Sequence, residues 1–270
     1  HGHHRSGRLQ RVTTGIEGNA LTNQSHVSLR VLGDVLHHGK NRLAGRTLAN
    51  AGNTAEALLD QAVVVEELNL NVCVILGQLS RKLTEADQAI EHDRRIARRQ
   101  SPIGRLVCES YAAAYRRDQH LPDDALVVGV SHFGSIRSGF PKGDITVLNV
   151  GEVLPFANKL NAYRYTGREL LDLMNFGYTE CKLGFVQTSG VIPVLDKRGR
   201  VTSISLQLPT GRVVPIRPNT KLVLVADDYM TTGGDGYPVK LFPKTDELPH
   251  HMPTSTDSFI AYLRTLKKIG

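Results

Sequence analysis

The residues best suited to binding chemistry lie together after a short apolar run. Residues 227–232 supply two carboxylates, two threonines and Tyr229, and the Gly-Gly-Asp-Gly sequence that follows includes Gly234 and Asp235. Glycines at this density let the backbone adopt positive φ and approach a ligand closely. An aromatic ring, an acidic acceptor and open backbone are the parts of a small-molecule binding loop. A plain glycine-rich turn with an incidental tyrosine explains the same residues equally well.

A predicted strand positions this loop. Residues 222–226 form an unbroken, valine-rich apolar run whose length favours a buried strand over a helix. A second run of this kind, residues 125–130, leads directly into a polar stretch that contains His132 and Arg137. Binding residues are commonly found on loops that follow buried strands. We therefore regard both strand-to-loop transitions as candidate binding segments.

Other elements are predicted from capping residues and turn residues. Ser101 and Pro102 predict a helix start, with serine as the N-cap and proline in the first helical position. Pro155 interrupts any helix and presents Phe156 beside it. The further expected elements are a turn at 142–146, strands at 159–165, 201–208 and 213–216, two short strands within 185–195, and helices at 166–176 and from residue 256 or 257.

Composition changes sharply near residue 100. All twelve prolines, all three methionines, all seven phenylalanines and all eight tyrosines follow Gln100. Aromatic side chains supply much of the buried area of ordinary cores. We therefore expect residues 1–97 to be an irregular, partly helical, poorly packed segment and residues 98–270 to form the folded domain. A misread or frame-shifted reading of the N-terminal part is an alternative explanation.

Within the N-terminal part, a few local signals are readable. Asn53 is expected to cap one helix, and residues 72–76 are expected to form a strand. Thr84 and Asp87 predict a second helix, which would carry the arginines between residues 94 and 99. The histidines at positions 1, 3 and 4 are a weak metal signal, because they lack a carboxylate partner.

The overall charge favours anionic partners without choosing among them. The formal net charge is +7, which suits nucleic acids, membrane surfaces and phosphorylated small molecules alike. Arginines on a helix more often form a solvated face than a nucleic-acid site, so a nucleic-acid partner is the less favoured reading. No apolar run approaches the length of a membrane span. Three widely spaced cysteines form neither a metal motif nor a disulfide framework.

A linked series of motifs resembles a known family. Taken in order and spacing, the series is similar to the C-terminal, substrate-binding domain of the 5′-nucleotidase family, from about residue 98 to the end of the chain. The motifs are Asp144-Ile145-Thr146, Leu154-Pro155-Phe156-Ala157-Asn158, Thr166-Gly167-Arg168-Glu169-Leu170, Ser189-Gly190 and Gly233-Gly234-Asp235-Gly236-Tyr237.

The resemblance implies a four-layer α/β/β/α fold, of the α+β class, with a nucleotide or nucleoside as its ligand. Phe156 and Tyr229 would hold the base between them, and Asp235 would accept hydrogen bonds from ribose hydroxyls. Arg137 and Arg99 would bind phosphate. The remaining candidate substrate-binding residues are His132 and Gly234.

This chain departs from the family pattern at the binding loops. His132-Phe133-Gly134 stands where the family has an Asn-Gly-Gly type sequence, and Pro102-Ile103-Gly104 stands where it has Asn-Met-Gly. Both replaced asparagines lie near the nucleotide in the family.

The family's metal motifs are also missing from the first hundred residues. In the family, hydrolysis takes place in a separate N-terminal domain with two divalent metals, zinc or manganese. The first hundred residues contain no Asp-x-His, Gly-Asp-x-x-Asp or Gly-Asn-His sequence, although residues 1–4 could be the tail of the family's last metal motif. We therefore predict no catalytic residues, no metal site and no cofactor in this chain.

Three hypotheses about function follow, and the sequence does not decide whether the chain is an enzyme. The chain is part of a metal-dependent nucleoside phosphate hydrolase, a non-catalytic nucleotide-binding module or, least favoured, a basic nucleic-acid-binding protein. The resemblance implies a periplasmic or extracellular location. Base preference and oligomeric state are not predicted.

Overall fold

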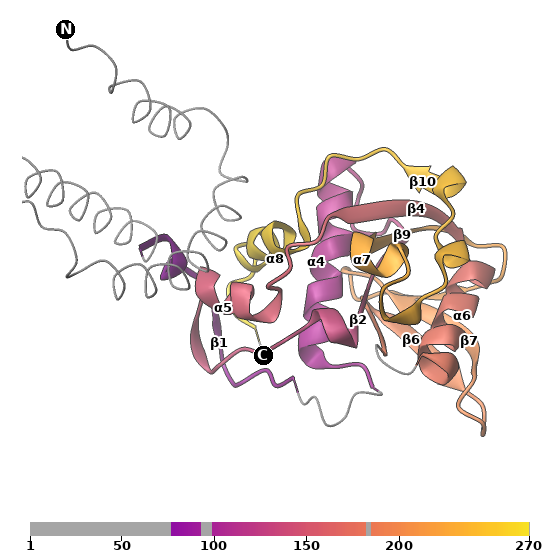
Figure 1. Ribbon diagram of the computed structural model, residues 1–270, viewed down its shortest axis with the longest axis horizontal. Helices are drawn as coiled ribbons and strands as arrows, with labels where there is room; N and C mark the ends of the chain where they lie inside the picture. The colour runs from indigo at the N-terminus through magenta and orange to yellow at the C-terminus, as the bar shows by residue number, and fades with distance from the viewer. Residues whose placement is uncertain (1–76, 93–98, 182–184, 270) are drawn as a thin grey trace, which may run out of the picture. The chain divides into compact units, whose positions relative to one another are not determined.

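The computed structural model describes residues 77–92, 99–181 and 185–269, shown in colour in Figure 1. These residues belong to one compact unit that begins at Leu76. The predicted Asn53 helix, the strand at 72–76, the poor packing of the N-terminal segment and the arginines at 94–98 lie outside the described residues.

A five-stranded sheet lies at the centre of this unit, in the order β10-β4-β9-β2-β5. Strands β2 and β9 run parallel, with Val127 opposite Val223, while β4 pairs antiparallel with all of β9. Side chains of β9 alternate between two cores, and so both faces of this sheet are buried. Burial on both faces explains why β2 and β9 appear as unbroken apolar runs. The strands are β2 (Val127–His132), β4 (Leu160–Thr166), β5 (Val186–Thr188), β9 (Lys221–Asp227) and β10 (Glu247–Leu248).

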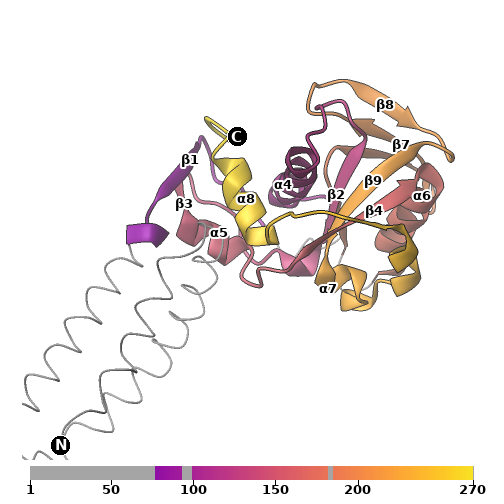
Figure 2. The same cartoon turned by 90° about the horizontal axis from the view of Figure 1, so that it is seen from above.

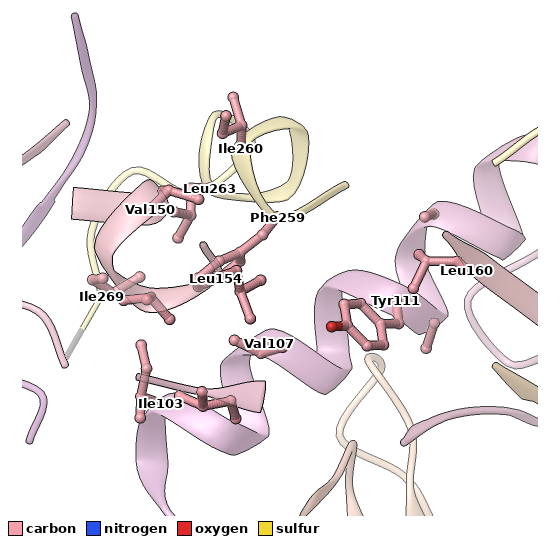
Figure 3. Packing of buried hydrophobic residues seen from close by; sticks show 14 of the residues in the cluster. Ile103, Val107, Tyr111, Val150, Leu154, Leu160, Phe259, Ile260, Leu263 and Ile269 are labelled. Atoms are coloured by element: carbon pink, nitrogen blue, oxygen red, sulfur yellow. The ribbon is translucent and has the colours of Figure 1, made fainter. Parts of the chain in front are cut away.

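Helix α4 (Pro102–Asp118) packs on one face of the sheet. Helix α8 (Ser255–Leu263) packs against α4, and α5 (Val147–Val153) packs against α8. Ser101 accepts a hydrogen bond from Gly104 N and Pro102 opens the helix, so the predicted start of α4 is confirmed. Figure 3 shows Val107 and Tyr111 of α4 in the same core as Phe259 of α8. A two-stranded sheet of β1 (Lys82–Ala86) and β3 (Gly143–Thr146) contributes to this core through Ala86 and Ile145.

The opposite face is covered by a three-stranded sheet and α6 (Gly167–Asn175), as Figure 2 shows. This sheet has the order β6-β7-β8, with β6 (Val191–Leu195), β7 (Val201–Gln207) and β8 (Val213–Ile216). Tyr163 and Leu224 of the central sheet share a core with Leu173 of α6 and Ile204 of β7. The predicted mixture of helices and sheets is therefore confirmed.

Two local predictions are wrong. Thr84 lies inside β1 and pairs with Ile145 instead of starting a helix, and its hydroxyl donates to Leu266 O. Residues 143–146 form β3 and not a turn, because they pair with β1. In both cases the partner is distant in sequence. The two predicted strands within 185–195 are confirmed as β5 and β6.

The division of the chain at residues 97 and 98 stays a prediction, since much of the segment before it is outside the described residues. Within the described part, β1 already belongs to the compact unit. The short helices are η1 (Phe133–Ser135), η2 (Phe176–Glu180), α7 (Asp228–Thr231), η3 (Gly234–Gly236), η4 (Val239–Leu241) and η5 (Lys244–Asp246).

Candidate functional site

Three loops meet at one end of the central sheet. The parallel strands β2 and β9 end at His132 and Asp227, and β4 begins there because Leu160 pairs with Asp227. The backbone N–H of Asp228 donates to Lys159 O at 2.9 Å, which joins the loop before β4 to α7. Segments far apart in the sequence therefore present their side chains at the same edge.

Two of these loops, the one before β4 and the one after β9, each carry an exposed aromatic ring. Phe156 is 59% exposed and Tyr229 is 48% exposed. His132 stacks on Tyr229, with ring centroids 5.4 Å apart, and the Arg137 guanidinium lies 5.9 Å from the centroid of Phe156. Both rings thus have a polar or charged neighbour at the sheet edge. That the two rings face each other across one flat ligand stays a prediction.

A chain of polar contacts connects the loops. His132 Nδ1 lies 2.7 Å from Asp235 Oδ2, and the other ring nitrogen is hydrogen-bonded to Ser135 Oγ. Tyr229 donates its hydroxyl to Asp235 Oδ1 at 3.3 Å. The hydrogen bond from His132 holds the pKa of Asp235 below its ordinary value, and the charge of Arg137 adds to this effect. Asp235 is therefore an ionised acceptor with a fixed orientation.

Ser135, His132 and Asp235 have the connectivity of a catalytic triad, but their burial assigns them another task. His132 is 2% exposed and Ser135 is 4% exposed, so the hydroxyl is poorly placed to attack a substrate. The arrangement instead orients Asp235, whose backbone takes the uncommon left-handed conformation at φ 50°. Sequence reasoning missed Ser135; the available signal was its position three residues after His132.

Two glycines allow this close packing. A Cβ atom at Gly134 would overlap Asp235 Oδ2 and lie 3.0 Å from His132 Nδ1. A Cβ atom at Gly234 would overlap the ring of Tyr229. Gly234 therefore has a packing role, and its part in ligand binding stays a prediction.

The two predicted phosphate-binding arginines lie in different surroundings. Arg137 is exposed, donates to Gly134 O at 3.2 Å and belongs to the cluster with Phe156 and Asp235. Arg99 is also exposed, but it lines a separate cavity of about 900 Å³ together with Phe133. The structure thus brings the predicted site residues together except for Arg99. Their roles toward a ligand stay predictions.

Asp227 is a further positioning residue that sequence reasoning did not single out. It is fully buried, caps α7 by accepting from Met230 N at 2.9 Å, and accepts from Ser131 Oγ at 3.2 Å. Burial raises the pKa of Asp227 above its ordinary value. By capping α7, this carboxylate fixes the helix that carries Tyr229.

The described residues contain no group of three or more His, Cys, Asp or Glu side chains that could hold a metal ion. The implied zinc or manganese centre therefore has no counterpart in that part of the chain. Nor is any helix there both long and apolar enough to cross a membrane.

Comparison with known proteins gives the family. The sequence profile described as 5′-nucleotidase, C-terminal domain, matches residues 77–241. The chain belongs to this family, and the predicted resemblance is confirmed.

Individual relatives agree with this assignment. The chain is 28% identical over 164 residues to a 5′-nucleotidase of Vibrio vulnificus, covering 60% of this chain and 27% of that protein. It is 28% identical over 150 residues to the trifunctional nucleotide phosphoesterase YfkN of Bacillus subtilis, covering 53% of this chain and 10% of that protein. This chain therefore matches less than a third of either relative.

The fold agrees as well. The crystal structure of a 5′-nucleotidase precursor from Thermus thermophilus superposes with a TM-score of 0.62 and 26% identity. The superposition covers 76% of this chain and 40% of that one. The described unit is thus similar to part of a larger nucleotidase.

Proposed function

We propose that residues 98–270 form the nucleotide-binding domain of a 5′-nucleotidase-type phosphohydrolase. One observation carries the proposal: two exposed aromatic rings lie at the same end of adjacent strands, Phe156 on the loop that leads into β4 and Tyr229 directly after β9. Flat, sequence-independent stacking on aromatic rings is a common way to bind nucleobases.

The polar neighbours of these rings suit the rest of a nucleotide. Asp235 is ionised and held by His132, and so it can accept hydrogen bonds from ribose hydroxyls. Arg137 is exposed beside Phe156 and offers a guanidinium fork to phosphate. Arg99 joins the phosphate site in this proposal if the ligand extends to it. The four-layer order α/β/β/α, with α6 as the outer helix layer, belongs to the same proposal.

Calorimetry with adenosine and AMP tests the proposal. Phe156→Ala should weaken both ligands, because it removes a stacking surface worth about 1–3 kcal/mol per base. Arg137→Ala should weaken AMP alone, by about 1.5–3 kcal/mol, because a charge-assisted hydrogen bond to phosphate is lost. Affinities for adenosine and AMP that neither substitution changes from the wild-type values would refute the assignment.

The activity of the parent protein is a separate proposal. We infer metal-dependent hydrolysis of nucleoside phosphates, with zinc or manganese held outside the described residues, and a periplasmic or extracellular location. The alternative is a nucleotide-binding module without catalysis of its own. Phosphate release from AMP by this chain, with manganese or zinc added, separates the two readings, because the module would bind AMP without turnover.

A further inference from the structure

A second cavity, of about 550 Å³, runs along α4, bounded on its other sides by the end of β7 and by α8. None of the predicted site residues lines it. The helix contributes side chains spaced three or four positions apart, and so they share one face. These helix residues are Arg105, Glu109, Ala112, Ala113, Arg116 and Arg117.

The middle of the cavity is apolar, and at one end the polar side chains already form hydrogen bonds with one another. Ala112 and Ala113 face a wall that includes Leu206. At one end Arg105 donates to Glu109 Oε1 at 2.8 Å and to the Gln207 side chain at 3.1 Å. Tyr262 donates to the second oxygen of Glu109. A ligand gains little from this closed network.

The other end holds a buried cation without an ion pair. Arg116 is 8% exposed, and one terminal nitrogen donates to Ala125 O and Val127 O at 3.2 and 3.1 Å. Its Nε has no hydrogen-bond partner among the residues that the structure describes. In the part of the chain that the structure describes, no carboxylate lies within ion-pair distance of this guanidinium, although the exposed Asp123 also lines this end.

Arg117 adds a second positive charge at the rim. It is exposed, and its side chain donates no hydrogen bond to the described residues. Buried arginines are rare unless paired, and an unsatisfied buried donor requires an explanation, such as an absent ion. A cavity that is lined by apolar side chains and by the buried guanidinium of Arg116 has the composition of a small-molecule site.

We propose that this cavity binds a small organic anion, with its phosphate or carboxylate group at Arg116 and Arg117 and its apolar body on Ala112 and Ala113. Guanidinium groups bind both kinds of anion through paired hydrogen bonds. Arg116 lies eleven positions after Arg105 on α4, which is about 16 Å along the helix axis. A ligand with a single ring therefore fills only the half of the cavity that contains Arg116 and Arg117.

Calorimetry with phenyl phosphate, benzoate and inorganic phosphate tests the site. Phenyl phosphate should bind about tenfold more tightly than inorganic phosphate, because its ring leaves water for the apolar floor. Benzoate separates carboxylate from phosphate recognition. Arg117→Gln should weaken phenyl phosphate by about tenfold, since one charge-assisted contact is lost. Ala113→Leu should weaken it by filling the cavity, while Arg168→Gln, an exposed helix arginine on α6, should change nothing.

Phenyl phosphate also resembles a ligand of the proposed nucleotide site, and Phe156→Ala distinguishes the two places. This variant should leave phenyl phosphate binding intact if the cavity on α4 holds it. Loss of binding in Phe156→Ala but not in Arg117→Gln would overturn the inference and support the nucleotide site. Absence of binding, or binding that neither Arg117→Gln nor Ala113→Leu affects, would also overturn it.

Discussion

Replacement of His132 by phenylalanine should expose the energetic value of the contacts that hold Asp235. Phenylalanine keeps the ring that stacks on Tyr229 but removes both ring nitrogens. The variant loses a contact to the ionised Asp235 and a hydrogen bond to Ser135. A hydrogen bond to a charged group contributes about 1.5–3 kcal/mol and a neutral one about 0.5–1.5 kcal/mol. Because Asp235 is partly open to water, we expect the free energy of unfolding to fall by about 2–3 kcal/mol at pH 7.

The difference in stability between wild type and His132→Phe should depend on pH. Contact with His132 lowers the pKa of Asp235 in the folded state. The corresponding stabilisation is present above the unfolded pKa, about 3.9, and is lost as the pH falls through the lower folded value. The difference between wild type and His132→Phe should therefore be large at pH 7 and smaller near pH 2.5.

Urea unfolding at both pH values measures the difference, with His251→Phe as a control at an exposed histidine. A loss below about 0.5 kcal/mol at pH 7 would contradict a stabilising contact between His132 and Asp235. A loss that is the same at both pH values would show that packing, and not the charge of Asp235, accounts for it.

Three further substitutions test the packing and the binding loop. Gly134→Ala should destabilise the fold by about 1–3 kcal/mol by overlap with Asp235, whereas Gly77→Ala, whose new Cβ atom meets no atom of the described residues within 4 Å, should be nearly neutral in the same unfolding assay. Phe259→Ala should lower the free energy of unfolding by about 3–5 kcal/mol, because Phe259 is fully buried in the core that α8 shares with α4; a loss under 1 kcal/mol would contradict that packing. Tyr229→Phe keeps the stacking ring and removes only a 3.3 Å hydrogen bond, so adenosine affinity measured by calorimetry should stay within about threefold; a tenfold loss would show that the hydroxyl itself holds the ligand.

Much of the central sheet could be predicted because its signals are local. The strands β2 and β9 are buried on both faces, and such strands have unbroken apolar runs. The start of α4 was equally readable, since Ser101 caps it and Pro102 fits its first turn. Strand β1 was not predicted, because Thr84 is also a good cap and only its pairing with Ile145, far along the chain, selects the strand.

The candidate site also contains residues that local sequence patterns predict and one residue that they do not. Phe156, Tyr229 and Asp235 could be named as candidates because each lies in a loop marked by proline or glycine and in a motif that matches the family. Ser135 was missed, because its relevance depends on His132 also reaching Asp235 across the sheet end. No local pattern encodes a contact between residues so far apart in the chain.

The geometry at His132 also bears on the departure from the family pattern. An asparagine in this position offers one side-chain donor group, and histidine keeps a ring nitrogen, Nδ1, 2.7 Å from Asp235 Oδ2. The second ring nitrogen then needs a partner inside a buried strand end, and Ser135 supplies it. Asp235 is left with lone pairs on both oxygens beyond those used by His132 and Tyr229. The replacement of asparagine by histidine is therefore compatible with an aspartate that still accepts hydrogen bonds from a ligand.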